Sequence, residues 1–279
     1  MTEKTLNNRK NGMVVLLLLV LVYVASVVLF IFGVSYDILP LTLISCVWFV
    51  FGWIFFLGLK VLKPQEALVL TLFGKYVGTL KNSGFYFVNP FCTAVNPAAG
   101  TKLNQSGDVK VLGAKQPSGG ADVSIDIPTK KISLKIMTLN NNRQKINDCL
   151  GNPVEIGIAV MWKVVDTAKA VFNVDNYKEY LSLQCDSALR NIVRIYPYDI
   201  APNVDTTGDG IADEGSLRGS SEVVAARIKD EIQDKVSEAG IEILEARITY
   251  LAYAPEIAAV MLQRQQASAI IDARKMIVD

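Results

Sequence analysis

Two long apolar runs lie near the start of the chain, separated by a short polar break. The first extends from Met13 to Phe32 and the second from Leu39 to Leu59, and neither contains a charged residue. At a rise of about 1.5 Å per residue, about 20 helical residues cross a hydrocarbon core of about 30 Å. The pattern therefore predicts a transmembrane helical hairpin over residues 13–60, with Asp37 in the turn between its helices.

Two other interpretations of the apolar runs were weighed. A cleaved secretory signal is disfavoured, because the first run is longer than a typical signal core and no cleavage pattern precedes the second. A shallow hairpin that enters one leaflet and returns stays open, since Gly52 and Gly58 would permit a bend in the second run. The lengths of both runs favour a full crossing.

Basic residues flank the hairpin on its two outer ends. The connecting break has no lysine or arginine, and basic residues near membrane ends favour the cytoplasm. We therefore expect a cytoplasmic N-terminal tail (1–12), a cytoplasmic body after the hairpin, and an address in the cytoplasmic (inner) membrane. The flanking basic residues are Lys4, Arg9, Lys10, Lys60 and Lys63.

Beyond the hairpin the pattern becomes that of a folded body with short strands and amphipathic helices. Strands are predicted over 67–73, 76–80, 85–88, 130–139, 154–164 and 241–251. Helices are predicted over 167–174, 177–196 and 221–239, and a last one begins at Pro255. Such an order predicts an α+β domain over 61–250, followed over 251–279 by the start of a long helix.

Two stretches of the body stand out. In the strand 154–164, alternate positions from Val154 to Val164 form one apolar face, which marks it as the strongest strand of the chain. Residues 96–128 instead are rich in glycine and proline and poor in aromatic residues. They indicate a flexible insertion or a long hairpin.

Composition removes several classes of function. There are 28 basic and 27 acidic residues, and this near-neutral balance gives no sign of nucleic-acid binding. The chain has no histidine, which excludes Ser-His-Asp and Cys-His catalysis and every histidine-ligated metal site. No phosphate-loop motif is present, and no cofactor is predicted.

The four cysteines are widely spaced and form no C-x-x-C pair. They are interpreted as unlinked thiols in a reducing compartment, although the sequence leaves open a pairing of two of them. Their positions are Cys46, Cys92, Cys149 and Cys185.

One loop has a weak likeness to a calcium site. Asp205, Thr207, Asp209 and Asp213 fall at ligand positions of an EF-hand register, and Gly210 falls at its turn. The twelfth position is a serine instead of the usual glutamate, so a polar surface loop is the favoured interpretation. A membrane-tethered, calcium-responsive receptor is kept as one alternative function, and a Ser-Lys hydrolase, which needs no histidine, as another; no S-x-x-K or G-x-S-x-G motif supports the latter.

The last helix is apolar over about 24 residues and needs a partner, either its own domain or neighbouring copies of the chain. We favour neighbouring copies. The residues predicted to make this oligomeric contact are Val260, Ala267, Ile270, Ile271 and Ile277.

Several stretches together resemble the SPFH or band 7 family, which includes stomatin-, prohibitin-, flotillin- and HflK/C-like proteins, here of a prokaryotic type. The resemblance covers about residues 60–279, and none of its motifs is catalytic. The stretches that carry it are 64–67, 73–79, 83–91, 148–156, 162–166, 251–258 and 263–267.

This resemblance implies a non-enzymatic membrane scaffold. Such a protein assembles laterally with itself into a large ring or cage, organises a membrane microdomain of lipids, and encloses client proteins that include membrane proteases. Two departures are noted: the 96–128 segment is larger than expected, and family members usually continue further along the last helix.

Overall fold

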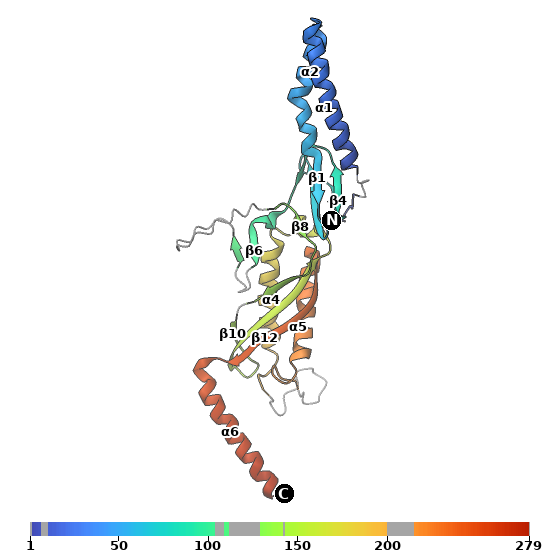
Figure 1. The fold of residues 1–279 in the computed structure, drawn as a ribbon. Coiled ribbons are helices and arrows are strands. Elements are labelled where there is room, and N and C mark those ends of the chain that lie inside the picture. The colour runs from blue at the N-terminus through green and yellow to red at the C-terminus, as the bar shows by residue number, and fades with distance from the viewer. Residues whose placement is uncertain are drawn as a thin grey trace, which may run out of the picture. The chain divides into compact units, whose positions relative to one another are not determined.

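The computed structural model describes residues 2–6, 11–103, 109–111, 129–141, 143–199 and 215–278. Figure 1 shows the ribbon, with the elements labelled along the chain. The chain divides into two compact units. Unit 1 comprises Met1–Gly100, Pro117–Lys135 and Val164–Asn176, and unit 2 comprises Thr101–Gln116, Ile136–Lys163 and Tyr177–Asp279.

Unit 1 begins with the predicted helical hairpin. Helix α1 (Gly12–Ser35) is continuous, as expected. The second apolar run is not one α-helix: α2 (Leu39–Phe51) changes into a 3₁₀ segment, η1 (Gly52–Gly58). Pro40 lies in the first turn of α2, where its missing N–H removes no helical hydrogen bond.

The rest of unit 1 is built from short antiparallel strands and one short helix. In one sheet β2 lies between β3 and β5 and also pairs with β8, while β1 pairs with β4. Helix α3 (Thr167–Phe172) is capped at its start, because the Asp166 side chain accepts a hydrogen bond from the Lys169 N–H. The strands are β1 (Leu59–Leu62), β2 (Glu66–Leu72), β3 (Lys75–Leu80), β4 (Gly84–Phe87), β5 (Cys92–Ala94) and β8 (Ile132–Ser133).

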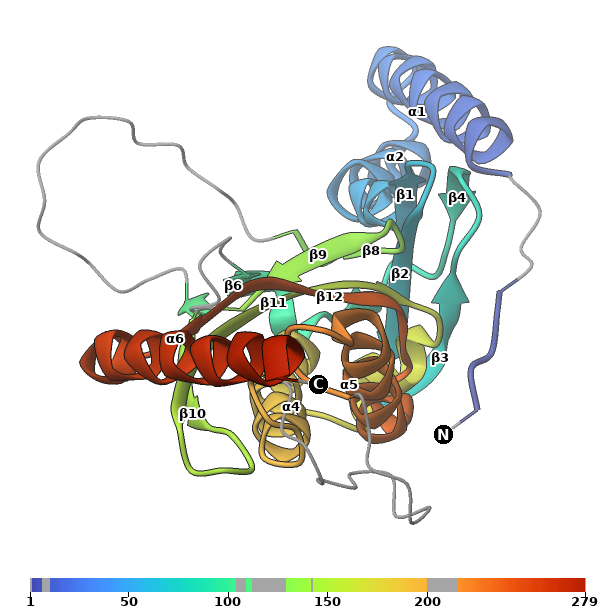
Figure 2. The ribbon, with the colours of Figure 1, turned by 90° about the horizontal axis from the view of Figure 1, so that it is seen from below.

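Unit 2 is a sheet with two helices on one face (Figure 2). The sheet order is β10–β11–β12, and β9 also pairs with β11. A hydrogen bond from Ala254 N to Pro153 O and an ion pair of 3.0 Å between Lys163 and Glu242 show that β11 and β12 run antiparallel. The strands are β9 (Met137–Asn140), β10 (Gln144–Asn147), β11 (Pro153–Val164) and β12 (Ile241–Tyr253).

The helices of unit 2 follow the predicted order. Helices α4 and α5 lie side by side on the sheet (Figure 2), and α6 starts directly after β12. Gly240 has the left-handed conformation (φ 66°) expected after a helix end. The elements are α4 (Tyr177–Val193), α5 (Ser221–Val236), the 3₁₀ turn η3 (Ser237–Ala239) and α6 (Pro255–Val278).

The core of unit 2 forms on the predicted face of β11. Every second side chain of this strand, from Val154 to Val164, is buried. Trp162 packs edge-on against Tyr177 at the start of α4, with ring centroids 6.3 Å apart. The helices contribute the residues that their 3.6-residue period predicts, including Leu181 and Ile228. The α+β prediction is therefore confirmed.

Three details of the prediction are wrong. The strand expected over 130–139 is interrupted and forms β8 and β9, which pair with different strands. Helix α4 ends at Val193, before the predicted end at 196, so Ile195 follows the helix and is 42% exposed. Strands β1, β5 and β10 had not been predicted at all.

Within residues 96–128 the structure describes a 3₁₀ turn and two short strands. Strands β6 (Thr101–Leu103) and β7 (Val109–Val111) form an antiparallel hairpin, which agrees with the second of the two interpretations. The turn, η2 (Pro97–Gly100), precedes the first of these strands. The candidate calcium residues Asp205, Thr207, Asp209 and Asp213 lie outside the described residues.

The buried face of β11 gives a stability test. Replacing Ile158 by alanine should lower the free energy of unfolding by about 2–5 kcal/mol, because the side chain is fully buried and its loss leaves a cavity. Met161→Ala, on the half-buried opposite face, is the matched control and should cost less than half as much. Urea unfolding followed by tryptophan fluorescence measures both, and equal losses would contradict the assigned faces.

Candidate membrane anchor and assembly helix

Two helical segments of unit 1 are long and apolar enough to cross a membrane, namely Gly12–Ser35 and Leu39–Gly58. Most of their large apolar side chains are exposed, as lipid-facing side chains would be. Hydroxyl groups within the segments bond to backbone carbonyls: Ser26 Oγ donates to Tyr23 O at 2.7 Å and Ser45 Oγ to Leu41 O at 2.9 Å. Polar groups satisfied inside the segment are what a lipid environment requires.

An aromatic cluster joins the two helices of the hairpin. The Tyr23 ring of α1 lies 6.3 Å from Trp48, 6.0 Å from Phe49 and 5.6 Å from Phe56, measured between ring centroids. Gly52 leaves room for this contact, since an added Cβ there would lie 3.0 Å from the Tyr23 hydroxyl. The hairpin thus has its own packing, which fixes α1 against α2 and η1.

Both ends of the hairpin are attached to the same unit. After the second apolar segment, the chain enters β1, and Val88 N donates to Gly58 O at 2.9 Å. Before the first segment, Leu6 N donates to Thr79 O at 2.9 Å and Thr79 N donates to Lys4 O at 2.8 Å. Two ends that hydrogen-bond to one folded body must lie on one side of the membrane.

An ion pair strengthens the attachment of the N-terminal tail. The Lys81 ammonium lies 2.5 Å from Glu3 and donates a second hydrogen bond to Val165 O at 2.7 Å. The other Glu3 oxygen accepts hydrogen bonds from the N–H and the hydroxyl of Thr167. A partly buried carboxylate with this many donors holds its segment more firmly than an exposed surface pair would.

At the other end of the chain, α6 starts from a fixed corner of unit 2. Ala254 is fully buried, and its backbone N–H donates a hydrogen bond to Pro153 O. The Tyr253 ring packs on the Tyr198 ring, with centroids 3.9 Å apart. Glu256, in the first turn of α6, forms an ion pair of 2.6 Å with Lys145 of β10. The hydrogen bond from Lys145 lowers the pKa of Glu256.

Beyond its first turn α6 extends away from the sheet of unit 2 (Figure 1). Of the residues predicted for assembly, Val260 is 62%, Ile270 56% and Ile271 55% exposed, and Ala267 is also exposed. The side chain of Ile277 is outside what the structure describes. At about 100° per residue, Val260, Ala267 and Ile271 lie within about 40° of one another, and Ile270 is about 80° from Val260.

One exposed apolar residue of α6 had not been predicted. Leu262 is as exposed as the predicted residues, but it lies about 200° around the helix from Val260. The prediction had followed a single stripe along the helix and therefore passed over it. A second exposed apolar position on the other side means that α6 can contact partners on more than one face.

The described residues do not favour a Ser-Lys site, and the candidate calcium loop lies outside them. They contain no group of three or more His, Cys, Asp or Glu side chains placed to hold a metal. A lysine–serine contact exists, Lys235 Nζ to Ser187 Oγ at 3.5 Å, but the same ammonium lies 2.9 Å from Glu231, whose pKa it lowers. An ammonium held by a carboxylate is a poor base for activating a serine.

The cysteines are free thiols in the structure, in agreement with their spacing. Cys92 and Cys185 are buried, and Cys46 and Cys149 are exposed. Desolvation raises the pKa of Cys92, Cys149 and Cys185, which disfavours the reactive thiolate.

A family model, described as SPFH domain / Band 7 family, matches residues 60–276. This match covers most of the chain and all of the β-rich body. The chain belongs to the SPFH domain / Band 7 family. No curated protein matched the chain. The SPFH match begins where the apolar hairpin ends and includes most of α6. The start of α6 therefore lies within the matched region, and the end of the hairpin lies directly before it.

Gly58 provides a test of how the anchor joins the SPFH body. An alanine Cβ at this position would lie 2.4 Å from Val88 O and 2.8 Å from the Phe87 ring, so the backbone must shift. Gly58→Ala should cost about 1–3 kcal/mol. The midpoint of thermal unfolding in detergent should therefore fall by several degrees. Gly100→Ala, where nothing lies within 4 Å of an added Cβ, is the control; equal midpoints for the two variants would refute the close contact.

Proposed function

We propose that this chain is a non-enzymatic membrane scaffold, which assembles laterally with copies of itself into a ring or cage and thereby organises a membrane microdomain. The observation that carries the proposal is α6, a helix fixed at its start and lined with exposed apolar residues. Such a surface is unfavourable in water and marks a contact with a partner. Membership of the SPFH family is consistent with this role.

The anchor explains why copies would meet. A hairpin with both ends on one body gives every copy the same orientation in one plane. Confinement to a plane raises the effective concentration, so weak lateral contacts suffice for assembly. A heterologous contact of this kind gives a ring when its rotation closes. The enclosed lipids and client proteins, with membrane proteases among them, would be the partners of the assembled ring.

The proposed address is the cytoplasmic membrane, with the SPFH body in the cytoplasm. The support is the excess of lysine and arginine at the two outer ends of the hairpin and their absence from its turn. The common attachment of both ends to unit 1 agrees with this arrangement.

Charged substitutions on α6 test the assembly. Val260→Glu combined with Ile271→Glu places two carboxylates on the apolar stripe, and burying them in a contact between copies is unfavourable. The wild-type chain in mild detergent should elute as a very large particle, and the double variant as a particle at least several-fold smaller. Size-exclusion chromatography with light scattering measures both.

The matched control is Ala258→Glu with Gln266→Glu, which adds the same charge at exposed positions of α6 that lie about 120° or more around the helix from Val260 and Ile271. This variant should keep the wild-type size. A wild-type chain that is monomeric, or a stripe variant of unchanged size, would refute assembly through α6. Electron microscopy of the gently solubilised wild-type protein should show rings of uniform diameter.

Cysteine labelling tests the topology. In a Cys149→Ser background, Tyr36→Cys places a thiol in the exposed turn of the hairpin and Thr2→Cys places one in the N-terminal tail. A membrane-impermeant maleimide should label position 36 in intact cells, and position 2 after permeabilisation. A position 36 that stays unlabelled until permeabilisation would refute the proposed topology.

A further inference from the structure

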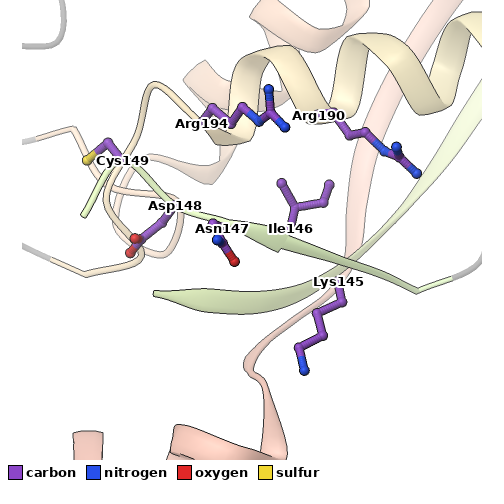
Figure 3. A pocket seen from close by; sticks show the side chains of 7 residues that line it. All are labelled: Lys145, Ile146, Asn147, Asp148, Cys149, Arg190 and Arg194. Carbon is purple, nitrogen blue, oxygen red and sulfur yellow. The ribbon is translucent and has the colours of Figure 1, made fainter. Parts of the chain in front are cut away.

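A cleft of about 610 Å³ lies in unit 2 between strand β10 and the C-terminal half of helix α4. Figure 3 shows Arg190 of α4 and Arg194, directly after the end of α4, at one side of the cleft, and Ile146 of β10 between the strand and the helix. Asp148 and Cys149 lie at the end of the strand. Both arginines are exposed, whereas Ile146 is buried and gives the cleft an apolar floor.

The carboxylates near the cleft are already engaged. Asp148 is buried and accepts hydrogen bonds from the backbone N–H groups of Leu150 at 2.9 Å, Asn152 at 2.7 Å and Tyr198 at 3.2 Å. Asp186, one turn before Arg190 on α4, accepts from the side-chain amides of Asn141 and Gln144. Both carboxylates therefore accept their hydrogen bonds from neutral N–H groups and not from the two arginines.

The arginines, in contrast, keep donors available. Arg190 Nε donates to Gln144 Oε1 at 3.3 Å, a contact that leaves its terminal nitrogens open to the cleft. Among the residues that the structure describes, none forms a hydrogen bond or ion pair with the Arg194 guanidinium. Lys145 is held by Glu256 and points away from the two arginines (Figure 3). The cleft therefore carries an excess of positive charge at the C-terminal end of α4.

The other wall of the cleft is a strand edge. Strand β10 pairs antiparallel with β11, from Gln144 opposite Ile156 to Asn147 opposite Pro153. In the described part of the chain β10 has no second neighbour and stands at the end of the sheet order. Its outer N–H and C=O groups are thus open to pairing, beside two guanidinium groups and above an apolar floor.

We propose that this cleft binds an extended, acidic peptide segment of a partner protein. The segment adds to β10 as a further strand, and its carboxylates bind Arg190 and Arg194. Arginine pairs with carboxylates through two parallel hydrogen bonds, and a strand edge supplies backbone affinity with little sequence preference. This site is separate from the proposed assembly through α6, because all the residues that form it belong to one copy of the chain.

A peptide fits the cleft better than a small anion or a lipid headgroup. Phosphate or a headgroup would use the arginines but would leave the open edge of β10 and the Ile146 floor unused. A peptide strand pairs with the β10 edge through its backbone, and every second side chain faces α4, where carboxylates reach the arginines beside Ile146.

Binding can be measured by fluorescence anisotropy with the full chain in detergent. The probe is a labelled eight-residue peptide of alternating valine and glutamate, and the same peptide with lysine in place of glutamate is its control. The acidic probe should bind and the basic one should not. Arg190→Gln with Arg194→Gln should weaken binding by at least about tenfold, because two charge-assisted hydrogen-bond donors are lost.

Two controls separate this site from other effects. Arg247→Gln removes an exposed arginine from β12 and should leave affinity unchanged. The assembly-deficient Val260→Glu/Ile271→Glu variant should still bind, so failure of assembly and failure of peptide binding are distinguishable. Circular dichroism of every variant must match the wild type.

The strand-pairing part of the proposal has its own test. Alternate N-methylation of the acidic probe removes the N–H groups that would pair with β10, and should weaken binding at least about tenfold at unchanged charge. An N-methylated probe that binds equally well overturns strand addition. Unchanged affinity of the double arginine variant overturns the site, as does binding of inorganic phosphate or phosphatidylglycerol vesicles through these arginines without binding of the peptide.

Discussion

The attachment of both ends of the apolar hairpin to one folded body is the constraint on which the rest depends. The tail before α1 pairs with β3 through Thr79, and the segment after η1 continues directly into β1. Two uncharged segments of this length are stable in lipid, and a hairpin that crosses a membrane with both ends on one body gives that body one orientation. Diffusion is then restricted to a plane, and contacts too weak to join free proteins can join anchored ones.

The fixed start of α6 limits the ways in which neighbouring copies could meet. A helix that left its unit through a loose linker could place its exposed apolar side chains anywhere, and neighbouring copies would meet in many geometries. Here the burial of Ala254, the stacking of Tyr253 on Tyr198 and the Lys145–Glu256 pair set the direction in which α6 leaves β12. A set direction repeated in every copy is what a closed assembly requires, because closure depends on one constant rotation between neighbours.

The sequence predicted the elements that a local pattern of apolar and polar residues marks. It missed those that form through contacts with residues far away in the chain. The face of β11 and the helical faces of α4 and α5 follow from periodicity, since each buries one continuous stripe. Strand β1 was missed because its residues continue the apolar run of the membrane segment, and β10 because, of its four residues, Ile146 alone is buried. The cleft was missed for a related reason: Arg190 and β10 are far apart in the sequence, and nothing local indicates that they meet.

The charge beside the short, polar edge of β10 explains how this strand could stay open if copies of the chain assemble as proposed. An unpaired edge is a template for unwanted pairing between identical chains. Two β10 edges that met would bring two pairs of arginines together, and this like-charge contact opposes pairing with a second copy. The same charge attracts an acidic segment. Arg190 and Arg194 therefore disfavour pairing with another copy of the chain, the most abundant neighbour in an assembly, and favour a partner that carries acidic residues.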